Sequence, residues 1–76
     1  MPQAPFSPRI SIRVNGEPRE VEAGWTLATL IADLSLDPRM IVVERNREIV
    51  RDRTTFDEVT LQDSDVLELV HFVGGG

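Results

Sequence analysis

The C-terminal residues Val73-Gly74-Gly75-Gly76 carry the most distinctive chemistry in this chain. Three successive glycines have no side chain to pack, and ordering them costs much backbone entropy. They follow directly on the apolar run 66–73, which is typical of a buried strand. Four extended residues span about 13 Å at ~3.3 Å each, enough to enter a narrow channel in another protein. The glycine run is therefore either a thin tail that carries the Gly76 carboxylate into a partner, or a disordered terminus or cloning scar without function.

The rest of the chain lacks the side chains that covalent catalysis or metal binding would need. There is no cysteine, and all 8 cationic side chains are arginine, so a catalytic thiol, a disulfide and a Schiff-base lysine are excluded. His71 is the single histidine, which argues against a metal site. Thr54 and Thr55 have no neighbouring base to activate a hydroxyl group. We therefore expect no catalysis by the side chains of this chain, and no bound cofactor or metal.

Length and composition limit the remaining classes of function. The chain has 76 residues, 41% hydrophobic residues and a net charge of −5, which is typical of one small globular domain. An acidic domain is unsuited to nucleic acid, whose phosphates need a basic surface. No run approaches the length of a membrane span, and no cationic start followed by an apolar stretch suggests export. We expect a cytoplasmic protein that binds neither nucleic acid nor membranes.

The apolar pattern predicts one mixed sheet. Asn15-Gly16 is a strong hairpin signal, because both residues tolerate the positive φ of a type I′ turn. The last apolar run has apolar residues on both faces, which is typical of a central strand. The predicted strands are residues 10–14, 19–22, 40–43, 49–50 and 66–73.

One helix is predicted between the second and third strands. Thr26 can cap its start, and Pro38 forces it to end beforehand. Its apolar residues share one face: Leu27, Leu30, Ile31 and Leu34. The segment 51–61 is expected to be irregular, with core residues Phe56, Val59 and Leu61. This order predicts an α+β fold, the β-grasp or ubiquitin-like fold, with the last strand between the first and the third.

The predicted domain is flanked by two different ends. Residues 1–9 are expected to form a flexible proline-rich arm, residues 10–73 the β-grasp domain, and residues 74–76 the reactive tail. If Leu67 and Leu69 face the helix, then Val70 and Phe72 face outward on the same strand. Val42 should face outward on the third strand, so an exposed apolar patch of Val42, Val70 and Phe72 is predicted beside the tail. Such patches tend to mark partner sites, unless the arm covers them through Phe6.

A group of arginines lies around the predicted turn between the third and fourth strands. Its members are Arg45, Arg47, Arg51 and Arg53. We expect them to form a solvated surface balanced by nearby carboxylates, which are Glu44, Glu48 and Asp52.

Several of these segments together resemble the ThiS sulfur carrier proteins of thiamine biosynthesis. The resemblance covers about residues 10–76, and it is carried by the following stretches: Ile41-Val42-Val43-Glu44-Arg45-Asn46, Glu48-Ile49-Val50, Leu61-Gln62-Asp63-Ser64-Asp65 and Val70-His71-Phe72-Val73-Gly74-Gly75-Gly76. A terminal pair of glycines is a weak signal alone, but it is specific when it ends a β-grasp domain. The proline-rich arm lies outside the resemblance and is longer than the family usually has.

The resemblance implies a chemistry for the tail. A ubiquitin-activating-type adenylyltransferase, similar to ThiF, would join the Gly76 carboxylate to AMP from ATP. Sulfur from a persulfide donor would then replace AMP and leave a thiocarboxylate on Gly76. A thiazole synthase, similar to ThiG, would take that sulfur to build the thiazole ring. In this scheme Gly74 and Gly75 keep the tail thin, and Gly76 alone changes covalently.

Three other functions fit the same fold and tail. The small subunit of molybdopterin synthase is a related carrier, but that family often has paired prolines before its glycines, where this chain has His71-Phe72-Val73. A ubiquitin-like protein modifier is compatible with the tail, although the missing lysines exclude lysine-linked chains of this protein. A β-grasp interaction module would need no chemistry at Gly76.

Overall fold

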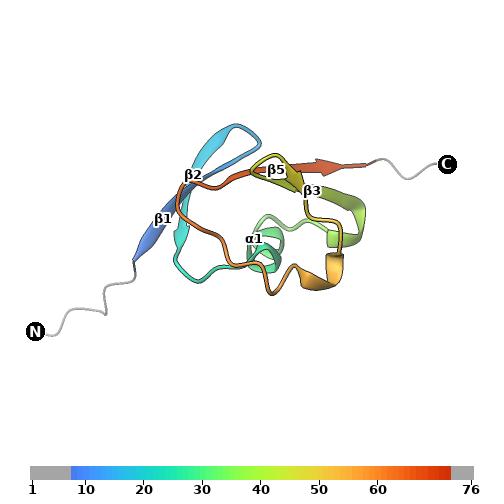
Figure 1. Ribbon diagram of the computed structural model, residues 1–76, viewed down its shortest axis with the longest axis horizontal. Helices are drawn as coiled ribbons and strands as arrows, with labels where there is room; N and C mark the ends of the chain where they lie inside the picture. The colour runs from blue at the N-terminus through green and yellow to red at the C-terminus, as the bar shows by residue number, and fades with distance from the viewer. Residues whose placement is uncertain (1–7, 73–76) are drawn as a thin grey trace, which may run out of the picture.

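The computed structural model describes residues 8–72 and contains one sheet packed on one helix (Figure 1). The predicted tail of Gly74, Gly75 and Gly76 and the arm residue Phe6 lie outside the described residues. The elements in chain order are β1 (Arg9–Val14), β2 (Glu17–Glu22), α1 (Leu27–Asp33), the 3-10 helix η1 (Pro38–Met40), β3 (Ile41–Arg45), β4 (Glu48–Ile49), the 3-10 helix η2 (Arg53–Thr55) and β5 (Val66–His71).

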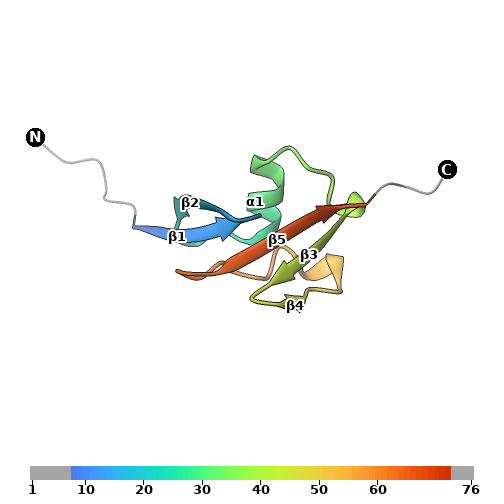
Figure 2. The ribbon, with the colours of Figure 1, turned by 90° about the horizontal axis from the view of Figure 1, so that it is seen from above.

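The sheet has the order β2-β1-β5-β3-β4, with β5 in the centre. β5 is parallel to β1 and antiparallel to β3, whereas the β1–β2 and β3–β4 pairs are antiparallel hairpins. The prediction of a central last strand between the first and the third is confirmed. In Figure 2, β5 crosses between β1 and β3, and the first and last described residues lie at opposite ends of the sheet.

Both edges of β5 are completed by an asparagine from a hairpin turn. Asn15 and Asn46 have φ of 51°, in the left-handed region that asparagine tolerates well. The Asn15 side chain accepts from the Leu69 amide at 2.8 Å and donates to its carbonyl at 3.3 Å. On the other edge, the Asn46 amide donates to the Val66 carbonyl at 2.8 Å, and Asn46 Oδ1 accepts from the Val66 amide at 2.9 Å. These bonds extend the sheet pairing beyond the ends of β1 and β3.

The core lies between the sheet and α1. Leu27, Leu30 and Ile31 on the helix are buried, and they pack with Leu67 and Leu69 of β5. Leu34, the fourth residue of the predicted face, is partly buried at the helix C-cap. Thr26 is the N-cap, since its hydroxyl oxygen accepts from the Thr29 amide at 3.2 Å. The predicted helix and its apolar face are therefore confirmed.

The segment 51–61 is more regular than its sequence suggested. It contains η2, and its chain runs beside the start of α1, where the Leu27 amide donates to the Val59 carbonyl at 3.0 Å. Phe56 and Leu61 are buried as predicted, and Val59 is partly buried against the core. This segment closes the side of the core that the sheet leaves open.

Candidate functional site

The outer face of the sheet carries the predicted apolar patch. Val42 and Val70 are directly opposite each other on β3 and β5. Their side chains are 37% and 57% exposed, and Phe72 is 37% exposed. Meanwhile Ile41, Val43, Leu67 and Leu69 are buried on the helix side. The period-two alternation therefore placed these residues correctly, and the patch of Val42, Val70 and Phe72 lies at the end of β5 where the chain leaves the sheet.

Two carboxylates and two further apolar residues extend this face. Glu44 and Glu68 are opposite each other on β3 and β5, next to the Val42–Val70 pair. Ile49 is opposite Glu44 and is 45% exposed, and Val66 on β5 is 41% exposed. Ile49 was absent from the predicted patch because β4 is too short to show an alternation. The outer face therefore has an apolar end near the tail and a mixed acidic and apolar end.

The patch is fixed to the base of the tail by the backbone. The Phe72 amide donates to the Met40 carbonyl at 3.0 Å, which continues the pairing with the β3 side after β5 ends at His71. In the adjoining η1 segment, Arg39 Nη2 lies 2.9 Å from Asp37 Oδ2. The guanidinium and amide of Arg39 both donate to Asp37 and lower the pKa of its carboxyl group to about 2. The Asp37–Arg39 ion pair therefore lies next to Met40, the residue whose carbonyl holds the Phe72 amide.

The predicted solvated surface is confirmed for three of its four arginines, since Arg47, Arg51 and Arg53 are exposed and Arg45 is partly buried, but the predicted carboxylate partners are wrong. Arg45 Nε donates to Oδ2 of the buried Asp65 at 3.0 Å. Arg53 donates to two backbone carbonyls, of Pro38 and Ile41. Within residues 8–72, none of the four arginines forms an ion pair with the expected carboxylates Glu44, Glu48 or Asp52. Sequence proximity suggested those partners, but the strand pairing brings other groups closer.

Asp65 is the buried polar centre that joins two turns. It is 4% exposed, and besides Arg45 it accepts from the Gln62 amide at 2.8 Å and from Asn46 Nδ2 at 2.9 Å. Burial by itself raises the pKa of this carboxyl group, but these three donors outweigh it and lower the pKa of Asp65 below its usual value. Asp65 is therefore an ionised group that locks the β3–β4 turn to the start of β5.

Comparisons with known proteins place this arrangement in a family. The model of the ThiS family matches residues 12–76, a range that includes the patch and the whole glycine run. The chain belongs to the ThiS family. It is 47% identical over 51 residues to the sulfur carrier protein ThiS of Bacillus subtilis, and the match covers 67% of this chain and 76% of that protein.

The structural comparison gives the same result for the fold. The crystal structure of the thiamine biosynthesis protein ThiS from Geobacter metallireducens matches with a TM-score of 0.75 and 31% identity, over 88% of this chain and all of that one. The predicted β-grasp fold is confirmed by this similarity and by the sheet order.

A longer protein also contains a region similar to this ThiS-family chain. The thiazole synthase of Magnetococcus marinus is 46% identical over 67 residues, which is 88% of this chain. The match spans 20% of the length of that synthase. Separately, no helix within residues 8–72 is both long enough and apolar enough to cross a membrane.

Proposed function

We propose that this protein is a sulfur carrier of thiamine biosynthesis that holds sulfur as a thiocarboxylate on Gly76. The observation that carries the proposal is the ThiS-family match through residue 76, so that the matched region includes the glycines as well as the sheet. The relative from Bacillus subtilis is named a sulfur carrier protein. This protein acts as a co-substrate of partner enzymes, and its own side chains perform no chemistry.

The chemistry begins with activation of the carboxylate. A ubiquitin-activating-type partner similar to ThiF catalyses attack of the Gly76 carboxylate on the α-phosphorus of ATP. Pyrophosphate leaves, and an acyl adenylate with a good leaving group forms. A persulfide then attacks the acyl carbon, and AMP departs. The product is an acyl disulfide. A thiol then attacks the donor's sulfur and forms a disulfide with it. The other sulfur stays on the acyl carbon of Gly76 as the thiocarboxylate.

The geometry of the domain supports such a role in two ways. Val42, Val70 and Phe72 give an exposed apolar surface whose burial can drive docking to a partner. The same surface lies next to the residue from which the tail continues, so docking at Val70 brings the following glycines to the partner. Glu44 and Glu68 beside the patch favour a partner that presents a cationic side chain next to its apolar contact.

The thiazole synthase is the second partner. A region similar to this chain occurs within the thiazole synthase of Magnetococcus marinus, which supports a functional link between the two proteins. We propose that the thiocarboxylate of Gly76 gives its sulfur to a thiazole synthase similar to ThiG. The small size of Gly74 and Gly75 allows the tail to enter the partner's channel without steric conflict.

Intact-protein mass spectrometry tests the proposal directly. The purified protein is first weighed alone, and its mass is compared with the mass expected for a chain that ends at Gly76. Incubation with ATP and the activating partner should add the mass of AMP less one water. Addition of a persulfide donor and a thiol should convert this to a gain equal to one sulfur replacing one oxygen, located on Gly76 by fragmentation.

Two variants identify the reacting group. Deletion of Gly75 and Gly76 should abolish both products while the melting temperature stays unchanged, because these glycines bury little apolar surface. Gly75→Val should sharply reduce both products, since a β-branched side chain widens the tail. A protein that remains uncharged with thiazole-pathway enzymes would refute the proposal. Charging only by molybdopterin-pathway enzymes would identify the related carrier, and attachment of Gly76 to lysines of other proteins would identify a modifier.

A further inference from the structure

The side chain of Arg53 connects η2 with η1 and with the end of β5. Its Nε donates to the carbonyl of Pro38, and its Nη2 donates to the carbonyl of Ile41, each at 3.0 Å. Its guanidinium carbon lies 5.9 Å from the centre of the Phe72 ring, within the range of a cation–π contact. One side chain therefore binds the first residue of η1 and the first residue of β3, and it contacts Phe72, the last residue that the structure describes.

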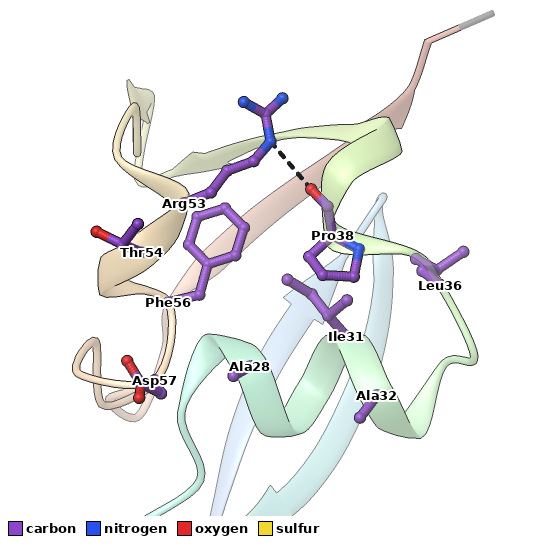
Figure 3. A pocket seen from close by; sticks show the side chains of 9 residues that line it. All are labelled: Ala28, Ile31, Ala32, Leu36, Pro38, Arg53, Thr54, Phe56 and Asp57. Carbon is purple, nitrogen blue, oxygen red and sulfur yellow. Dashed lines mark hydrogen bonds between the residues drawn. The ribbon is translucent and has the colours of Figure 1, made fainter. Parts of the chain in front are cut away.

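The Arg53 side chain lies over a core residue and extends from a capped turn. Figure 3 shows the Phe56 ring beneath the Arg53 side chain and the bond from Arg53 to Pro38, at the rim of an open groove above α1. Phe56 is 3% exposed and belongs to the core. The η2 turn is capped by Asp52, which accepts from the hydroxyl and the amide of Thr54; these bonds lower the pKa of the Asp52 carboxyl group. The backbone of Arg53 therefore belongs to a turn that the Asp52 cap holds by hydrogen bonds.

Arg53 acts on Phe72 by two routes. The first is the direct contact between the guanidinium group and the ring. The second passes through η1, because the Met40 carbonyl that accepts from the Phe72 amide lies between the two carbonyls held by Arg53. The ring and the backbone of Phe72 are therefore both tied to one cationic side chain.

We propose that Arg53 is a positioning residue that fixes Phe72 and so sets the direction in which the chain leaves the sheet toward Gly76. The functional part rests on the proposed sulfur-carrier role. Phe72 belongs to the docking patch and also begins the tail, so its orientation couples the docked pose to the path of the glycines. Small errors in placing a reacting group reduce turnover strongly. Arg53 makes this contribution without touching the reacting atoms.

Hydrogen exchange on the free protein tests the structural half of the proposal. In Arg53→Gln, the Phe72 amide should exchange at least about threefold faster than in the wild type, because the hold on the Met40 carbonyl is loosened. The Leu69 amide is an internal control, since Asn15 holds it independently of Arg53 at 2.8 Å. Arg53→Lys should be intermediate, because it keeps a charge near the ring but cannot bridge two carbonyls. An unchanged Phe72 exchange rate in Arg53→Gln would overturn the proposal.

Steady-state adenylation of the tail tests the functional half. At a temperature well below the melting point of the variant, Arg53→Gln should lower kcat by about two- to fivefold, the equivalent of one exposed cation–π contact. KM should change by less than about twofold, since Arg53 lies outside the docking patch. Phe72→Leu in the Arg53→Gln background should cost less than it does in the wild type, because the two residues act together. A raised KM with unchanged kcat would instead make Arg53 a partner contact and overturn the proposal.

The two halves separate failure of this proposal from failure of the proposed function. If the wild type is not adenylated at all, the sulfur-carrier role fails, and the exchange rate of the Phe72 amide alone decides whether Arg53 fixes Phe72. If the wild type is adenylated and Arg53→Gln is charged at the same rate, the carrier role stands and the positioning role of Arg53 fails.

Discussion

Replacing Asp65 with asparagine tests the polar network that joins β5 to the β3–β4 turn. The substitution keeps the shape of the side chain but turns one of its oxygens into a donor. Asp65 Oδ2 accepts from Gln62 and Arg45, and Oδ1 accepts from Asn46 Nδ2. The new NH2 group would then face the NH2 group of Asn46, and two donors cannot form a hydrogen bond with each other. Asn46 cannot rotate to relieve this, because its Oδ1 already accepts from the Val66 amide.

The magnitude follows from these contacts. At least one buried hydrogen bond is lost, and the two that remain are no longer assisted by the carboxylate charge. Together these changes should lower the free energy of unfolding by about 2–4 kcal/mol. The Arg45 side chain is 29% exposed, so water can partly replace its lost partner, which keeps the cost below that of a fully buried pair. For a domain of this size, the melting temperature should fall by about 10–25 °C.

The assay is urea unfolding of the wild type and Asp65→Asn over a range of pH. The folded pKa of Asp65 is lowered, so its stabilisation is fully present above the pKa of the unfolded carboxyl group, about 3.9, and is lost as the pH falls through the folded pKa. The difference between the two proteins should therefore be constant from pH 7 to about pH 5 and shrink below about pH 4. Other carboxylates titrate in both proteins and cancel.

Glu58→Gln is the matched control, because it removes the same charge from an exposed site without an ion pair in residues 8–72. Its free energy of unfolding should lie within about 0.5 kcal/mol of the wild type. If Asp65→Asn were as stable as this control at pH 7, the network would contribute nothing. If the difference between Asp65→Asn and the wild type persisted unchanged below pH 4, ionisation of Asp65 would not be its source.

Three further perturbations address the core, the turn and the patch. Leu30→Ala should cost about 2–5 kcal/mol in thermal or urea unfolding, because Leu30 is fully buried under the sheet, and a melt like that of the wild type would contradict the helix packing. Asn15→Gly should lower the free energy of unfolding by about 1–3 kcal/mol, because the hydrogen bonds to Leu69 are lost. Asn15→Ala should lower it further, because alanine disfavours a φ of 51°. Equal losses would show that the backbone conformation contributes nothing. Val70→Arg should weaken binding to the activating enzyme or the thiazole synthase at least about tenfold by calorimetry, with an unchanged circular dichroism spectrum. Val66→Arg, on the same face at the other end of β5, should bind normally. Similar losses of affinity in both variants would mean that the patch is misplaced.

The local pattern of apolar residues was enough to predict which side chains face the core and which face solvent. The alternation of apolar residues along a strand sets which side chains share a face, so the exposure of Val42, Val70 and Phe72 followed once one face was assigned to the helix. The helical face of Leu27, Leu30 and Ile31 and the cap at Thr26 followed in the same way from spacing over a few residues. The prediction of chemistry at the glycine run rests on the sequence and its family resemblance, since those residues lie outside the described structure.

Only the tertiary structure decided which hydrogen-bond partners the polar side chains have. Asn15 completes the edge of β5 at Leu69, which is 54 residues away in the chain, and Arg45 reaches Asp65 across 20 residues. Arg53 reaches the carbonyls of Pro38 in η1 and Ile41 in β3 rather than a neighbouring carboxylate. A polar side chain pairs with whichever backbone or buried group the packed sheet leaves without a partner, and that depends on strand order and register. Periodicity records which face a residue occupies, but not which unpaired group will lie beside it when the sheet closes on the helix.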